Sequence, residues 1–153
     1  MRLKARVVVA ATAAIASVLL GQQVARASDD LAQGAALYAE HCASCHGAEL
    51  EGAPDWRRRG ADGLYPAPPH DETGHTWHHG DRLLFDYTKL GGEATLATRG
   101  VLDFESGMPG FGHLLTDDQI RDVLAFIKST WPELMRSHQE DMTRQEAASQ
   151  GEE

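Results

Sequence analysis

Two cysteines and a histidine form the most informative cluster of the sequence. Cys42 and Cys45 are separated by two residues, His46 follows at once, and the chain contains no other cysteine. Covalent haem attachment requires this arrangement, because each thiol adds to one vinyl group of the porphyrin and the histidine then reaches the iron. The alternatives are a redox dithiol, a zinc site and a plain disulfide. A redox dithiol would need a surrounding βαβ pattern, a zinc site would need a second cysteine or histidine pair, and a disulfide would not need His46. The pattern therefore predicts one covalent haem c per chain, with His46 as an axial ligand of the iron.

One methionine is well placed to be the second axial ligand. Met108 stands between Gly107 and Pro109, shortly before the last strongly patterned helix, and belongs to no apolar helical face. Core packing therefore does not explain this methionine, whereas a thioether is an established ligand of haem iron. Met135 and Met142 lie too far along the chain to return easily to the iron. The other histidines, or an open position, remain the alternatives to Met108.

A second group of potential ligands lies in the middle of the chain. Four of the eight histidines occur within ten residues, together with Trp77: His70, His75, His78 and His79. Neutral imidazoles suit copper or zinc. Alternatively, Trp77 and the prolines before it cover the haem edge, where the indole N–H or one histidine bonds to a propionate. We favour this second interpretation, because only His75 and His79 have the i, i+4 spacing of a helical pair, and glycines flank them.

Three segments have the apolar periodicity of helices and would position these groups. They are 29–41, with Ser28 or Asp29 as its cap, 81–90, and the segment from the Thr116–Gln119 capping box to Pro132. Within the first, Gly34 predicts the close approach of another backbone, because glycine otherwise lowers helix stability.

The segments between these helices are rich in glycine and proline, and no segment has the pattern of a strand. We expect loops over 47–79 and 91–115, and a helical extension that frays into a disordered tail over 138–153. The predicted fold class is all-α, a small domain of three to four helices and long loops wrapped around one covalent haem. Since much of its core would be the haem, the chain without haem is expected to fold poorly.

The N-terminus has the pattern of a secretory signal. Basic residues precede an apolar run over 7–20, and Ala25 and Ala27 provide small side chains for cleavage after Ala27. The run is shorter than the roughly 20 residues of a membrane span, so an uncleaved N-terminal anchor is the less favoured alternative. We expect a leader over 1–27, one domain over 28–135 and a polar acidic tail over 136–153. Export agrees with the haem motif, because haem of this kind is generally attached outside the cytoplasm.

The charge balance constrains the partners. The predicted leader holds four of the 14 basic residues and no acidic residue, which leaves ten basic and 23 acidic residues and a formal charge of −13. Such a chain disfavours nucleic acid and strong association with anionic membranes, and it favours a redox partner with a basic docking face.

The order of these motifs resembles that of class I monohaem cytochromes c. The likeness rests on Gly34, on the Cys42–Gly47 motif, on the Gly107–Phe111 segment, and on a terminal helix containing 124–127. It implies a first and a last helix that cross at Gly34, haem held by Cys42 and Cys45, and iron bound by His46 and Met108. The histidine-rich middle segment is longer than a minimal member needs and is similar to that of a bacterial subgroup.

The resemblance implies an exported, non-enzymatic electron carrier. Histidine and methionine together saturate the iron, so one electron would pass between a dehydrogenase or membrane complex and an oxidase or reductase. Two alternatives stay open: a haem enzyme or gas sensor with an open sixth position, and a copper-handling protein that uses the His70–His79 stretch.

Overall fold

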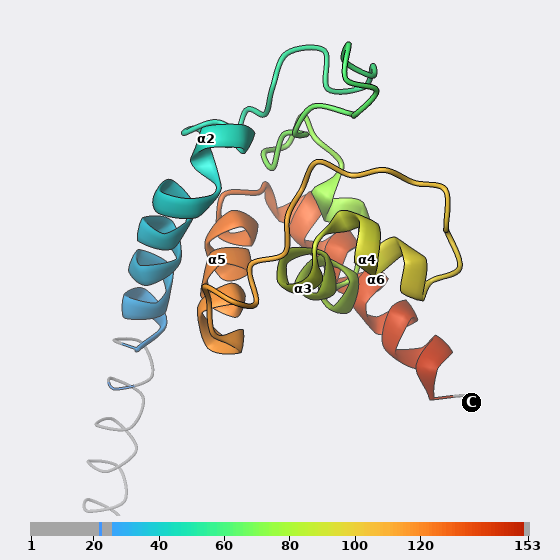
Figure 1. Cartoon of the computed structure of the whole chain (residues 1–153). Coiled ribbons are helices and arrows are strands. Elements are labelled where there is room, and N and C mark those ends of the chain that lie inside the picture. Colours follow the sequence, from blue (N-terminus) through green and yellow to red (C-terminus); the bar gives the residue numbers. More distant parts are fainter. Residues whose placement is uncertain (1–21, 23–25, 152–153) are drawn as a thin grey trace, which may run out of the picture.

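The computed structural model describes residue 22 and residues 26–151, and every regular element within them is helical (Figure 1). A first helix covers 26–41. The elements that follow are α2 (Ala43–His46), the 3-10 helix η1 (Thr76–His78), α3 (Asp81–Leu90), α4 (Gly92–Thr98), α5 (Asp117–Ser129) and α6 (Glu133–Gln150). The predicted all-α class is confirmed for this part of the chain. No helix among the described residues is long and apolar enough to cross a membrane.

The N-terminal helix starts earlier than expected. Residues 26–28 are helical, so the predicted cap at Ser28 or Asp29 does not begin the helix. Because the helix already includes residues before Ser28, these two residues lie inside it, and no side-chain cap is needed there. The predicted leader, 1–27, lies almost entirely outside the described residues.

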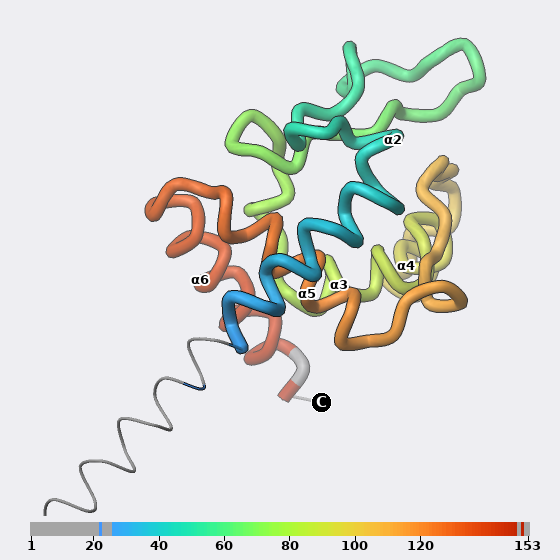
Figure 2. The backbone as a smooth tube through the Cα atoms, turned by 90° about the vertical axis from the view of Figure 1, so that its left-hand side faces the viewer, coloured from blue at the N-terminus to red at the C-terminus, as the bar shows by residue number. Residues whose placement is uncertain are grey.

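The first helix crosses α5 with the two backbones in contact (Figure 2). Gly34 is buried at the crossing, and a Cβ atom added to it would overlap the carbonyl oxygen of Asp122. Only glycine therefore permits this approach, as its place in the sequence predicted.

Helix α5 supplies both halves of the core from one apolar face. Val123 and Ile127 pack with Tyr38, Leu50 and Trp131. On the neighbouring turns of α5, Ile120 and Leu124 pack with Leu84 of α3 and with Leu115. The Thr116 capping box begins the helix as predicted, since the Thr116 hydroxyl accepts from the Gln119 N–H and the Gln119 side chain accepts from the Thr116 N–H.

The expected loop over 91–115 contains a helix. Gly91, with φ of +88°, ends α3, and α4 begins at the next residue. Thr95 is fully buried, and its hydroxyl donates to the Asp86 carbonyl of α3 at 2.8 Å. Two adjacent glycines indicate the end of a helix, but here Gly91 ends α3 while Gly92 is already the first residue of α4.

The helical extension expected from residue 138 is part of helix α6, but its expected fraying into a disordered tail is wrong up to residue 150. The predicted domain boundary at 135/136 falls inside this helix. Polar contacts, which an apolar pattern cannot reveal, hold α6 in place. Gln139 is buried and donates to Asp81 Oδ1 at 2.7 Å, and Glu146 Oε2 accepts from the Arg82 and Leu83 backbone N–H groups at 3.1 and 3.4 Å. The carboxylate thereby satisfies free N–H groups at the start of α3.

Candidate functional site

The cysteine and histidine motif lies at the end of the N-terminal helix. The Cys42 N–H still donates to the Tyr38 carbonyl, and the His46 N–H donates to the Cys42 carbonyl at 2.9 Å, so the chain turns directly into α2. Cys45 is exposed and Cys42 half-buried, and both thiols are free. His46 is buried, with 6% of its surface exposed. One turn of backbone thus presents two thiols and one imidazole together.

His46 is fixed in one orientation by a carbonyl group. Its Nδ1 atom lies 2.8 Å from the Pro68 oxygen, which can only accept, so Nδ1 carries the hydrogen and Nε2 keeps its lone pair. Burial lowers the pKa of His46, while the Pro68 contact opposes that shift. A neutral imidazole with one nitrogen anchored and the other free is the form in which histidine binds a metal.

The thiols do not have the properties of a redox dithiol. Burial, followed by the neighbouring Cys45, raises the pKa of Cys42 to about 11. Reactive Cys-x-x-Cys pairs need the opposite shift, because the thiolate is the nucleophile. The raised pKa of Cys42 is therefore the opposite of what a redox dithiol needs.

The segment that carries Met108 is tied to the junction of α3 and α4. The Gly92 N–H donates to the Met108 carbonyl at 3.2 Å, and the Phe111 N–H donates to the Thr88 carbonyl at 2.9 Å. The Met108 N–H in turn donates to Ser106 Oγ at 3.2 Å. Gly91 and Gly110 allow the α3–α4 junction and the Met108 segment to come into backbone contact. A Cβ atom on either glycine would overlap backbone atoms of the other segment. Met108 is therefore half-buried on an anchored segment rather than on a free loop.

By their ring contacts, the histidines of the stretch fall into three groups. His70 stacks on His46, with ring centroids 4.1 Å apart, and its carbonyl accepts from Trp131 Nε1 at 2.7 Å. His75 stacks on Trp56 and meets His79 edge-on at 5.3 Å. His78 stacks on Trp77, and both rings meet His138 of α6.

This division bears on the predicted second metal site. Within the part of the chain that the structure describes, no three His, Cys, Asp or Glu side chains are grouped closely enough to hold a metal ion. His70 stacks on His46, whereas His75 contacts Trp56 and His79. The stretch is therefore not one ligand cluster.

Trp77 provides a test of whether the residues suit haem. Its Nε1 atom is buried and is the one such side-chain nitrogen or oxygen of the described residues without a hydrogen-bond partner. The indole packs beside the core cluster of Tyr38 and Leu50. A buried N–H needs an acceptor, and a haem propionate oxygen would supply it. Together with the free thiols and the anchored imidazole, this orphaned donor fits the group.

Two supporting residues were not identified from the sequence. Pro68 belongs to the Pro66–Pro69 turn signal and provides the carbonyl for His46. Tyr38, whose hydroxyl donates to the Gly47 carbonyl at 2.9 Å, holds the end of the motif. A backbone acceptor has no side-chain signature, so only the fold could reveal the first of these.

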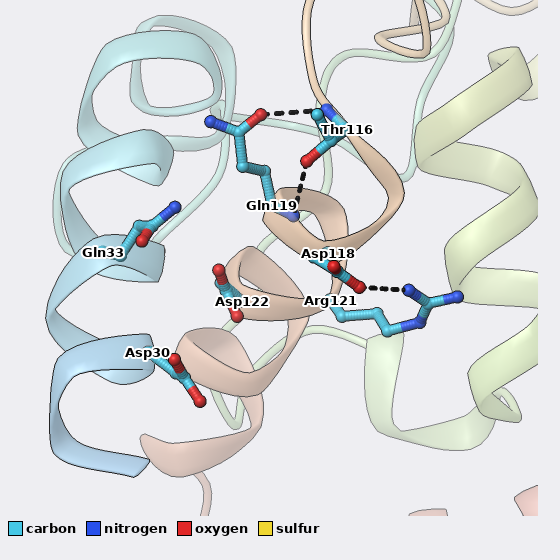
Figure 3. Close-up of a pocket in the computed structure, with 7 residues that line it drawn as sticks. All are labelled: Asp30, Gln33, Thr116, Asp118, Gln119, Arg121 and Asp122. Atoms are coloured by element: carbon cyan, nitrogen blue, oxygen red, sulfur yellow. Dashed lines mark hydrogen bonds and ion pairs between the residues drawn. The ribbon is translucent and has the colours of Figure 1, made fainter. Parts of the chain in front are cut away.

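An open groove lies away from the motif, between the N-terminal helix and the start of α5 (Figure 3). Its lining residues are Asp30, Gln33, Thr116, Asp118, Gln119, Arg121 and Asp122. Arg121 pairs with Asp118 at 2.7 Å. Desolvation, and then the charges of Asp30 and Asp118, raise the pKa of Asp122. The groove thus holds three carboxylates beside one arginine, and the charges of Asp30 and Asp118 disfavour the ionised form of Asp122.

Comparison with known proteins agrees with this site. The family model described as Cytochrome c matches residues 31–131, from the N-terminal helix to the end of the core at Trp131. The chain therefore belongs to the cytochrome c family, whose members carry haem and transfer electrons. Searches of curated proteins and of solved structures found no match.

Proposed function

We propose that this chain is an exported one-electron carrier with a single haem c attached through Cys42 and Cys45. The observation that carries the proposal is the anchored imidazole: His46 is buried beside the two thiols, with Nδ1 held by the Pro68 carbonyl. When bound, the haem supplies reversible one-electron chemistry at its iron.

The residues of the chain bind the haem and tune it. His46 presents Nε2 to the iron, and Pro68 fixes the ring and increases its basicity. His70 covers one face of His46, and its own pKa is lowered to about 3 by burial, then by His46 and His75, so it stays neutral there. The Trp77 N–H, which has no partner within the described residues, would donate to a propionate. These roles require no side chain that adds or removes a proton from a substrate.

Met108 is the second axial ligand in this proposal. Its support is the set of backbone hydrogen bonds that hold the segment against α3 and α4. An anchored segment lowers the entropic cost of keeping a thioether on the iron. A histidine and a thioether together leave no position for oxygen or substrate.

Export and the partner follow from sequence properties. The N-terminal pattern over 1–27 and covalent haem attachment both favour a compartment outside the cytoplasm, such as the periplasm. The acidic balance of the remaining chain favours a redox partner with a basic docking face.

Mass spectrometry and spectroscopy of the exported protein test this function. We expect a chain starting at Ser28 that carries the mass of one haem. The oxidised protein should show a weak thioether-to-iron(III) band at the red end of the spectrum, which Met108→Ala abolishes as it opens the iron to carbon monoxide in the reduced state.

Met135→Leu is the matched control, because Met135 packs beside the core and the substitution conserves its volume. It should retain the band. A parent protein that lacks the band and binds carbon monoxide readily would replace the carrier with a haem enzyme or sensor. A bare chain with a Cys42–Cys45 disulfide would contradict haem attachment.

A further inference from the structure

Three aromatic rings from two distant segments meet at the surface beside α6. His78 and Trp77 of η1 stack with their centroids 3.7 Å apart, and His138 of α6 meets both rings edge-on, at 5.3 Å from His78 and 5.5 Å from Trp77. His138 lies 60 residues after His78 in the sequence, so no local pattern connects the two rings.

The two imidazoles have free nitrogen atoms. The imidazole rings of His78 and His138 make no hydrogen bond within the described chain, in contrast to the ring of His70, whose Nδ1 lies 2.9 Å from Thr76 Oγ1. His78 is exposed and His138 is half-buried, so an ion can reach them from solvent. Two unbonded imidazoles in contact are available as metal ligands.

The separation of the rings matches shared coordination. A metal bound at about 2.0–2.1 Å from nitrogen lies about 3.2 Å from the ring centre, so two ligands at angles of about 110–120° place their ring centres about 5.1–5.5 Å apart. The observed separation of 5.3 Å falls in this range. The two rings meet edge-on, with an angle of 80° between their planes.

Helix α6 adds soft donors to the same face. Met135 and Met142 lie three residues before and four residues after His138, the spacings that place side chains on one face of a helix. Met135 and Trp77 both pack beside the same core cluster. Thioether and imidazole ligands together favour Cu(I) over the harder divalent ions, and Cu(I) can be bound by only two or three ligands.

We propose that His78 and His138 bind one Cu(I) ion, and that the thioether of Met142 or Met135 completes its coordination. The site uses none of the proposed haem ligands and holds whether or not Met108 binds the iron. The other ring pair, His75 and His79, is less suited to a cation. Burial is the main cause that lowers the pKa of both rings, followed by the neighbouring histidines, and Arg57 near His75 and Arg99 near His79 add positive charge.

Anaerobic competition with a chromophoric Cu(I) chelator tests the site in the haem-loaded protein. We expect one equivalent of Cu(I) to bind, and His78→Gln and His138→Gln each to weaken binding at least tenfold. Replacing both methionines by leucine should weaken Cu(I) binding while leaving any Zn(II) binding unchanged. An unaltered haem spectrum and far-ultraviolet circular dichroism would show that each variant is folded.

His79→Gln is the matched control, since it removes a ring of the same loop and should retain full affinity. Absence of Cu(I) binding in the parent protein would overturn the proposal. So would affinity that is lost in His79→Gln but kept in His138→Gln.

Discussion

Asp122 shows how one residue links charge to stability. Its pKa is raised by desolvation and then by Asp30 and Asp118, which line the same groove (Figure 3). The native state therefore binds a proton that the unfolded state has already lost, in the window between the ordinary carboxyl pKa and the raised one. Stability should fall as the pH rises through this window and stay reduced above it.

Asp122→Asn removes this repulsion. We expect the free energy of unfolding at neutral pH to rise by a few tenths of a kcal/mol, because the group is largely exposed to screening solvent. The gain should vanish at a pH below the ordinary carboxyl pKa and shrink in high salt. Urea unfolding at several pH values measures it, with exposed Asp103→Asn as the control. An equal gain at all pH values would exclude the charge explanation.

Among the helices, the close contact between the N-terminal helix and α5 restricts residue 34 to glycine. Alanine favours a helix over glycine by about 1 kcal/mol, so helix propensity alone predicts that Gly34→Ala stabilises the protein. The overlap with the Asp122 carbonyl predicts the opposite, a loss of about 1–3 kcal/mol in the free energy of unfolding. Denaturant unfolding gives the sign directly. Gln33→Ala, at an exposed neighbouring position, should stay within about 0.5 kcal/mol of the parent.

One carboxylate of α6 contacts the start of α3. Glu146 accepts two N–H groups at the start of α3 and pairs with Arg99 at 3.0 Å, and only 14% of its side chain is exposed. Glu146→Ala should lower the free energy of unfolding by about 1–2 kcal/mol, as loss of a helix cap does. Hydrogen exchange at the first turn of α3 should increase in the same variant.

Glu140→Ala is the control for this effect. Glu140 lies on the exposed side of α6, and its ion pair with Arg144 spans 4.0 Å. We expect a change of no more than about 0.5 kcal/mol. Equal losses in the two variants would mean that α6 contributes through helix propensity and not through its contact with α3.

For the whole molecule, the small polypeptide core implies dependence on the haem. Nine large apolar side chains are buried among the described residues, and four of them come from α5 alone. At about 25 cal/mol per Å² of buried apolar surface, a porphyrin would add substantially to such a core. We expect the double variant Cys42→Ser, Cys45→Ser to lose haem, much of its helical circular dichroism and its cooperative thermal transition. Cooperative unfolding near the parent midpoint would show that the polypeptide core is sufficient.

Features that depend on local chemistry and spacing could be predicted from the amino-acid sequence. It indicated the all-α class, the capping box at Thr116, the glycine at the helix crossing and the apolar face of α5, because each has a signature within a few residues. It also predicted the thiols and the histidine as one site, since they are neighbours in the chain.

The tertiary structure decided what depends on partners far apart in sequence. Helix α6 follows polar contacts of Gln139 and Glu146 with α3, not an apolar pattern, and was therefore expected to be a tail. The anchor of His46 is a backbone carbonyl 22 residues away, and the partner of His78 is a histidine 60 residues away. Such pairs form only when packing closes the long loops between them, and no local pattern records that closure.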